Sequence, residues 1–189
     1  MRGYLTISIA AGLLVAAVGA QAGDAAAGKS KGMKCISCHG LKGVTNNPQY
    51  PNIAGQNEAF LIAQMEAFKD GKRPLAAKSV LFGGLSSPDF VDLAAYFSGL
   101  PAGSAGSKAD AATLDKGKAG YDNCAGCHGD NGEGSKKGPR LAGQNTAYLV
   151  KRMGDYKSGA ADNKAMKSFA SDMSDADVSA VSEYLSSLK

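Results

Sequence analysis

The chain has 189 residues, enough for one medium domain or two small ones, and 44% of them are hydrophobic, as in an ordinary globular protein. Its formal net charge at pH 7 is a mild +4, spread over the chain without a basic block. The composition therefore allows a real core and argues against a nucleic-acid-binding protein.

Residues 1–22 have the parts of a secretory signal peptide. Arg2 precedes the apolar run LTISIAAGLLVAAVGA, and an AQA site ends at Ala22. The alternative is an uncleaved anchor helix, but the run is short and a cleavage-type site follows it. We expect cleavage after Ala22 and export to the periplasm.

The next feature is CISCHG, from Cys35 to Gly40, in which a C-x-x-C pair is followed directly by His39. Apolar side chains then recur at the spacing of one helix face, and a capping-box-like S-x-x-D opens a last amphipathic helix. The first face is formed by Leu61, Met65 and Phe68, the S-x-x-D runs from Ser86 to Asp89, and the last face is formed by Phe90, Leu93, Ala94 and Phe97.

The stretch LPAGSAGSKADA follows, and its small, Gly- and Ser-rich composition is typical of a flexible connector. We place the linker at 101–111, a first domain at 23–100 and a second domain at 112–189.

The second half repeats the first. CAGCHG, from Cys124 to Gly129, lies 89 residues after the first motif, and segments 51–99 and 139–187 align at an offset of 88 with 15 identities in 49 positions. Its helix faces are formed by Leu149, Met153 and Tyr156 and by Val178, Val181 and Leu185, with S-x-x-D from Ser174 to Asp177. No alternating strand pattern competes, so we predict an all-α fold of two tandem domains related by duplication.

C-x-x-C-H is the attachment signature of c-type haem. A thioredoxin-like pair would need a βαβ setting, and a zinc site would use both C-x-x-C pairs, whereas each half has one complete motif. We therefore predict two covalently bound c-type haems. Cys35, Cys38, Cys124 and Cys127 are the attachment residues, and His39 and His128 are the proximal iron ligands.

Domains of this size rarely build a sufficient core alone. A large covalently held cofactor would supply apolar surface that the helices lack. We expect poor folding without haem.

The distal ligands follow by elimination, because no third histidine and no fifth cysteine exist. Met33 lies on the proximal side of its motif, Met65 and Met153 are repeat equivalents on a core face, and Met173 occupies a plain apolar position. Met166 has no such structural reason for its place, and we assign it to the second haem.

The counterpart of Met166 in the first half is Lys78. Three interpretations stay open. In the first, Lys78 is a solvated lysine and the iron of the first haem binds water or nothing. In the second, the deprotonated amine of Lys78 ligates the iron. In the third, another residue is the distal ligand. Ligation has to compete with protonation of the amine. The first two interpretations predict two unlike haems.

Pro51 and Pro139 follow their motifs at the point where a backbone carbonyl could accept a hydrogen bond from the proximal histidine. A simple turn proline is the alternative.

The paired motifs, the AGQ segments at 54–56 and 142–144, and the LS and MS pairs before the last helices resemble the dihaem cytochrome c4 family over nearly the whole mature chain. The resemblance implies two cytochrome c domains packed about a pseudo-twofold axis. It also implies an axial methionine seven residues before the LS or MS pair, a pattern that Met166 satisfies and Lys78 breaks.

The resemblance further implies a periplasmic electron carrier, often associated peripherally with the membrane. Such a carrier would accept electrons from a quinol–cytochrome c reductase or another donor and pass them toward a haem–copper terminal oxidase or a reductase. Exposed lysines such as Lys136 and Lys137 would steer these partners. We expect an electron carrier with no catalytic residue.

The alternative is the cytochrome subunit of a redox enzyme similar to flavocytochrome c sulfide dehydrogenases, or small-molecule chemistry at an open first haem. The lack of a distal histidine for acid–base help argues against catalysis. A haem-stabilised interaction module without redox turnover is a third interpretation.

Overall fold

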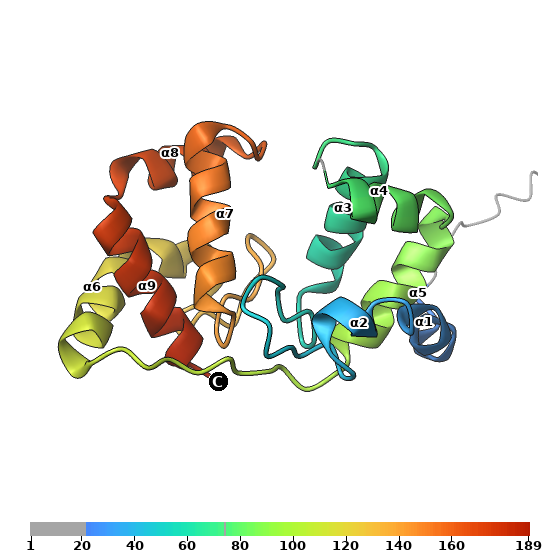
Figure 1. Cartoon of the computed structure of the whole chain (residues 1–189), viewed down its shortest axis with the longest axis horizontal. Coiled ribbons are helices and arrows are strands. Elements are labelled where there is room, and N and C mark those ends of the chain that lie inside the picture. The colour runs from blue at the N-terminus through green and yellow to red at the C-terminus, as the bar shows by residue number, and fades with distance from the viewer. Residues whose placement is uncertain (1–21, 74) are drawn as a thin grey trace, which may run out of the picture.

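The computed structural model describes residues 22–73 and 75–189, so the predicted signal peptide lies, except for Ala22, outside the described residues. Figure 1 shows two helical lobes joined by an extended segment. The described residues form helices and no strands, which confirms the all-α prediction. No helix in this part of the chain is long and apolar enough to cross a membrane.

Each lobe is built around its last helix. In the first lobe, α5 (Ser87–Ser98) packs against α1 (Ala25–Gly32) and α3 (Glu58–Lys69), and the lobe also contains α2 (Ile36–His39) and α4 (Ala76–Gly83). In the second lobe, α9 (Asp175–Ser187) packs against α6 (Ala111–His128) and α7 (Thr146–Ser158), and α8 (Lys164–Asp172) packs on α7. The single helix α6 therefore corresponds to α1 and α2 together, which a turn after Gly32 separates.

The expected helix faces contribute to the cores, except that Met153 and Tyr156, both half-buried, lie outside the core cluster of the second lobe. Leu61 packs with the last helix of the first lobe, and Leu149 does so in the second lobe. The full clusters are Leu61, Leu93, Ala94 and Phe97 in the first lobe and Tyr121, Leu149, Val181 and Leu185 in the second. Met65 and Met173 pack against these clusters, as expected of apolar core positions.

The S-x-x-D segments cap the last helices as predicted. The backbone N–H of Ser86 donates to Asp89 Oδ2 at 2.7 Å, and the N–H of Asp177 donates to Ser174 Oγ at 3.2 Å. Both contacts satisfy N–H groups that have no partner inside the helix.

Two glycines allow the crossing of the first and last helix in each lobe. A Cβ on Gly28 would collide with the backbone oxygen of Asp92, and a Cβ on Gly117 would collide with that of Ala180. These are equivalent positions of the repeat, so both lobes need glycine for the same close approach of two backbones.

The first lobe has a second, aromatic cluster that fixes α4. Phe82 on α4 stacks on Phe68 with ring centroids 5.7 Å apart and meets Phe90 edge-on at 5.9 Å. α4 is therefore anchored to both α3 and α5.

The connecting segment, residues 101–110, is extended and held by hydrogen bonds to the second lobe. Ala105 N–H donates to the carbonyl of Gly143 at 3.0 Å, and Ser186 Oγ donates to that of Gly106 at 2.7 Å. Ser104 Oγ donates to the Leu188 carbonyl at 3.0 Å. The composition suggested flexibility, but these contacts restrain the backbone.

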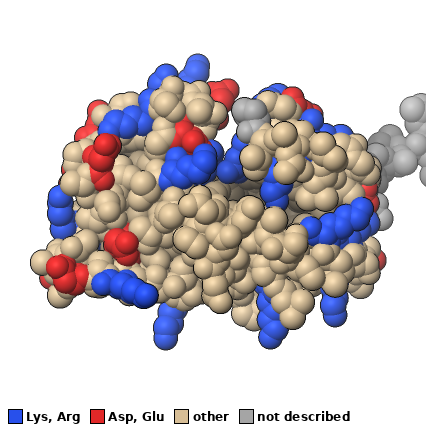
Figure 2. Space-filling view, in the orientation of Figure 1, with Lys and Arg blue, Asp and Glu red and all other residues tan. Residues whose placement is uncertain are grey.

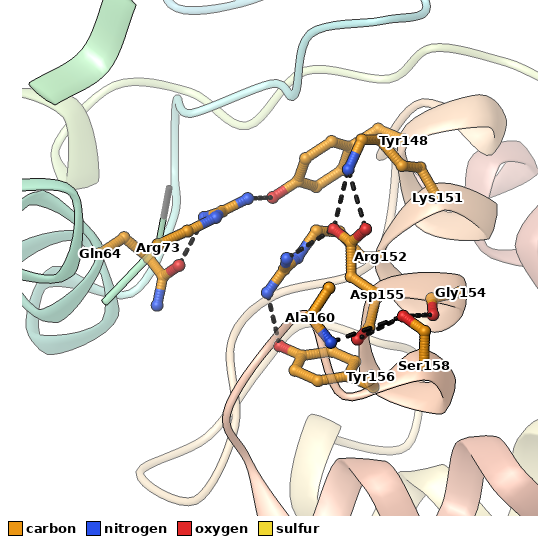
Figure 3. A network of polar contacts seen from close by, with 10 residues as sticks. All are labelled: Gln64, Arg73, Tyr148, Lys151, Arg152, Gly154, Asp155, Tyr156, Ser158 and Ala160. Carbon is orange, nitrogen blue, oxygen red and sulfur yellow. Dashed lines mark hydrogen bonds and ion pairs between the residues drawn. The ribbon is translucent and has the colours of Figure 1, made fainter. Parts of the chain in front are cut away.

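The lobes also contact each other directly, and reciprocal hydrogen bonds, from Gln56 to Arg140 and from Gln144 to Asn52, relate them by a pseudo-twofold axis. Figure 3 shows one of these contacts, in which Arg73 of the first lobe donates to the hydroxyl of Tyr148 on α7 at 3.3 Å. The same guanidinium donates to Gln64 on α3 at 2.5 Å, so Arg73 bridges the two lobes.

Candidate cofactor-binding sites

The first C-x-x-C-H motif forms the short helix α2. Cys35 is its N-cap residue, His39 its last residue, and Gly40 ends it with a φ of 78°. A Cβ on Gly40 would collide with the backbone oxygen of Val44, so the turn after His39 requires glycine. The motif helix thereby brings both thiols and the imidazole into one short turn.

The second motif is the last turn of α6. His128 ends the helix, and Gly129 follows with a φ of 84°, as Gly40 does in the first lobe. Cys124 is half-buried and Cys127 is exposed. All four cysteines of the chain are free thiols, so none is consumed by a disulfide and all are available for bonds to a cofactor.

Both histidines are fixed by a proline carbonyl. His39 Nδ1 lies 2.8 Å from the oxygen of Pro51, and His128 Nδ1 lies 2.9 Å from the oxygen of Pro139. A carbonyl only accepts, so Nδ1 carries the hydrogen in each ring and Nε2 keeps its lone pair. This confirms the hydrogen-bonding role considered for the two prolines.

Burial favours the neutral forms of these histidine and cysteine side chains. It lowers the pKa of His39 to about 4, with the nearby Lys78 charge adding to the effect and the bond to Pro51 opposing it. Burial also lowers the pKa of His128 and raises the pKa values of the Cys35 and Cys124 thiols. A neutral imidazole is the form that binds iron.

The structure brings Lys78 and His39 together. Lys78 lies on α4, half-buried, and its Nζ atom is 3.0 Å from His39 Nε2. Its ammonium also lies 5.7 Å from the ring centroid of Phe82, the residue that anchors α4. Burial lowers the pKa of Lys78. Because Nε2 carries no hydrogen, Lys78 donates to it, and the two groups would have to separate for a metal to bind between them.

Met166 occupies the equivalent place in the second lobe. It is the third residue of α8, as Lys78 is of α4, and it is half-buried. Between Met166 and His128, the described residues show no contact like that of Lys78 with His39. Met33 is exposed.

Further features of the described residues fit a porphyrin with acidic groups at its edge. Arg140, directly after Pro139, has a buried Nε without a hydrogen-bond partner in the described part of the chain. Large apolar side chains are exposed beside the motifs and on α4 and α8, namely Met33, Leu41, Leu75, Val80 and Phe169. Exposed apolar surface and an unpaired guanidinium nitrogen match a flat apolar group with carboxylates.

Sequence reasoning missed Gly138, which lies directly before Pro139. A Cβ there would lie 2.9 Å from two atoms of the His128 ring, so the loop can approach the imidazole only with glycine. The first lobe has Tyr50 at this position, and its ring meets His39 edge-on with centroids 6.0 Å apart. Comparing the residue before each repeated proline would have indicated this difference between the sites.

Comparisons with known proteins agree with this geometry. A family model described as cytochrome c matches residues 114–189. The cytochrome c4 of Pseudomonas aeruginosa is 37% identical over 182 residues, which cover 88% of this chain and 90% of that protein. The thiosulfate dehydrogenase electron acceptor of Thiomonas intermedia is 31% identical, covering 85% of this chain and 81% of that one.

A solved structure shows the same fold. The crystal structure of reduced recombinant cytochrome c4 from Pseudomonas stutzeri matches with a TM-score of 0.82 at 34% sequence identity. The match covers 89% of this chain and 100% of that one.

Proposed function

Because the chain belongs to the cytochrome c4 family, we propose that it carries electrons between redox proteins of the periplasm, from a donor such as a quinol–cytochrome c reductase toward a terminal oxidase or reductase. Membership confirms the resemblance found in the motifs. It also confirms a dihaem electron-transfer cytochrome with two covalently bound c-type haems in a two-domain cytochrome c fold. Export and cleavage after Ala22 remain part of the proposal.

One observation carries the proposal. Both lobes end a motif helix with a buried imidazole whose Nδ1–H is held by a proline carbonyl, and the whole arrangement occurs twice within one chain. A paired set of equivalent sites favours passage of electrons over chemistry on a substrate. We assign no catalytic residue.

A c-type haem supplies an iron centre that gains and loses one electron. In the proposal, Cys35 and Cys38 bind the first haem and Cys124 and Cys127 the second. Pro51 and Pro139 hold the imidazoles of His39 and His128 in the tautomer that leaves Nε2 free. Fixed ligands change little between redox states, which favours rapid electron transfer.

For the first haem we propose Lys78 as the distal ligand. Its amine faces Nε2 of His39, it is half-buried, and the aromatic cluster around Phe82 holds α4 in place. For the second haem we propose Met166, which has the equivalent place on α8. Methionine ligation raises the reduction potential, so the second haem would have the higher potential of the two.

Partner proteins would dock by charge. Lys136 and Lys137 are exposed beside the second motif, as steering residues must be. Figure 2 shows Lys and Arg side chains spread over the visible face, several of them beside the notch between the lobes.

The test uses the purified holoprotein. Anaerobic titration should show two electrons taken up per chain, and stopped-flow mixing should show reversible exchange with a c-type cytochrome partner. Failure of either haem to cycle reversibly would overturn the carrier function.

A second candidate keeps electron transfer but changes the donor. The similarity to the Thiomonas intermedia protein supports acceptance of electrons from a thiosulfate-oxidising dehydrogenase. Reduction of the holoprotein by such an enzyme with thiosulfate, faster than by a quinol–cytochrome c reductase with quinol, would favour this donor.

A further inference from the structure

Two glutamines cross the interface between the lobes in a reciprocal way. Gln144 Oε1 accepts from the N–H of Asn52 at 2.8 Å, and its Nε2 donates to the Asn52 carbonyl at 2.9 Å. Gln56 does the same to Arg140, with distances of 2.8 Å to its N–H and 2.9 Å to its carbonyl. Both glutamines are buried, with 6% and 7% of their surface exposed.

The N–H groups that the glutamines bind belong to the same peptide groups as the carbonyls that accept from the histidines. The N–H of Asn52 shares its peptide group with the carbonyl of Pro51, which accepts from His39 Nδ1. The N–H of Arg140 shares its peptide group with the carbonyl of Pro139, which accepts from His128 Nδ1. One planar amide therefore joins each histidine to the glutamine of the other lobe.

Such a chain of hydrogen bonds is cooperative. Acceptance of a hydrogen bond from the N–H of an amide polarises that amide and makes its carbonyl a stronger acceptor. A stronger acceptor at Nδ1–H raises the basicity of the imidazole as a ligand. A more basic ligand favours the ferric over the ferrous state and so lowers the reduction potential.

We propose that Gln144 is a positioning residue for His39 and Gln56 for His128, so that each haem's reduction potential is set in part by the opposite lobe. The proposal rests on proximal ligation by His39 and His128. It adds to electron transfer a contact through which each lobe acts on the proximal histidine of the other.

The orientation of the glutamines is fixed locally. Gln144 Oε1 also accepts from the N–H of Asn145 at 2.9 Å, and Gln56 Oε1 from that of Asn57 at 2.8 Å. These second bonds hold each carboxamide oxygen toward the partner peptide.

Other hydrogen bonds join the lobes without involving the two peptide groups that bind the histidines. Asn145 Nδ2 donates to the carbonyl of Tyr50 at 2.7 Å, and Arg73 donates to Tyr148 (Figure 3). Tyr50 packs on His39 and its carbonyl carbon is bonded to Pro51, so the contact of Asn145 is not independent of that site. Tyr148→Phe, which removes only the hydroxyl that binds Arg73, is therefore the matched control.

The experiment uses the reduced holoprotein labelled with ¹⁵N-histidine. Because the chain has only two histidines, each haem contributes one Nδ1–H signal. The ring-current shift of an imidazole bound under a haem reports ligation by itself. A redox titration followed through the haem methyl resonances gives the potential of each haem separately.

Gln144→Leu should move the His39 signal toward a weaker hydrogen bond and raise the potential of the first haem only. Gln56→Leu should do the same to His128 and the second haem. Gln144→Asn, which keeps the carboxamide on a shorter side chain, should weaken the same bond and move His39 in the same direction as Gln144→Leu, and Tyr148→Phe should change neither signal.

If the two lobes merely separated, the Nδ1–H signals of both histidines would shift in each variant. That result would overturn the proposal. A shift confined to the histidine of the substituted lobe would also overturn the proposal, as would the absence of any shift in Gln144→Asn, should Gln144→Leu fail to fold. If neither imidazole shows the ring-current shift, proximal ligation fails first, and this outcome is distinct from ligated histidines that do not respond.

Discussion

The Nζ atom of Lys78 lies 3.0 Å from the Nε2 atom of His39, at the place on α4 where the second lobe carries Met166 on α8. The two nitrogens are within hydrogen-bond distance of each other, so they would have to move apart for an iron to bind between them and be ligated from opposite sides. The duplicated chain would then hold two haems with the same proximal and different distal ligands.

Truncation of Lys78 should open the first haem. In Lys78→Ala the amine is gone, and carbon monoxide should bind the reduced first haem much faster than in the unaltered protein. The measurement is the absorbance change after flash photolysis of carbon monoxide. Lys42→Ala, which alters an exposed lysine near the same motif, is the control and should bind carbon monoxide as the unaltered protein does. Equal rates in all three proteins would rule out ligation by Lys78.

A methyl group at Gly138 should disturb the second site only. In Gly138→Ala the Cβ would lie 2.9 Å from the His128 ring, so the loop has to shift, at a cost of about 1–3 kcal/mol for overpacking. The shift should weaken the bond from Nδ1 to Pro139 and change the potential of the second haem.

The matched control for this substitution is Gly154→Ala, where a Cβ on α7 meets nothing within 4 Å. It should leave both potentials unchanged and stabilise the protein by up to about 1 kcal/mol through helix propensity. Redox titration and thermal unfolding measure both effects. Unchanged second-haem potential in Gly138→Ala would mean that the loop does not control the imidazole.

The ion cluster that joins α1 to α5 should make the free energy of unfolding depend on pH in the acidic range. Lys31 Nζ lies 2.5 Å from Asp89 Oδ1 and 2.6 Å from Asp92 Oδ2, and hydrogen bonds to Lys31 lower the pKa of both carboxyls. Because their pKa values are lower in the folded state, the stabilisation is present above the unfolded pKa of about 4 and is lost as pH falls below it.

Lys31→Met should therefore lower the unfolding temperature at pH 7 and reduce the further loss between about pH 4 and pH 2. Lys72→Met, which removes an exposed pair with Asp70, should have little effect at either pH. Identical pH profiles for Lys31→Met and the unaltered protein would show that the cluster contributes nothing.

Loss of the first haem should unfold the first lobe. Its small aromatic and aliphatic clusters leave apolar side chains exposed, so replacement of both Cys35 and Cys38 by alanine should abolish attachment and lower helicity by circular dichroism. Ser37→Ala, inside the same motif, should retain haem and structure. A fully helical double variant without its first haem would contradict the need for the cofactor.

The helices could be predicted because their cores follow a local period. Phe90, Leu93, Ala94 and Phe97 recur on one face of one helix and are all buried. Gly28 and Gln144 could not be interpreted in the same way. Their roles depend on Asp92 and Asn52, which come close only after the chain has folded, and a residue pattern does not encode such distances.

The site was predictable where chemistry restricts the residue type. Cysteine pairs and adjacent histidines indicate c-type haem from the sequence alone, and alignment of the repeat showed that Lys78 is the counterpart of Met166. The connector was harder to predict because its glycines and serines indicate flexibility, whereas bonds such as that from Ser186 to the Gly106 carbonyl restrain it. The repeated Gln56 and Gln144 supported the family resemblance, but the repeat did not show that each binds a peptide of the other lobe.

The most direct test of unlike distal ligands is the near-infrared magnetic circular dichroism of the ferric holoprotein. Methionine sulfur bound to ferric haem gives a characteristic charge-transfer band, and an amine gives a different one. We predict one band of each kind in the unaltered protein, and two methionine-type bands in Lys78→Met. Two methionine-type bands in the unaltered protein, or a high-spin first haem without a nitrogen distal ligand, would contradict the account.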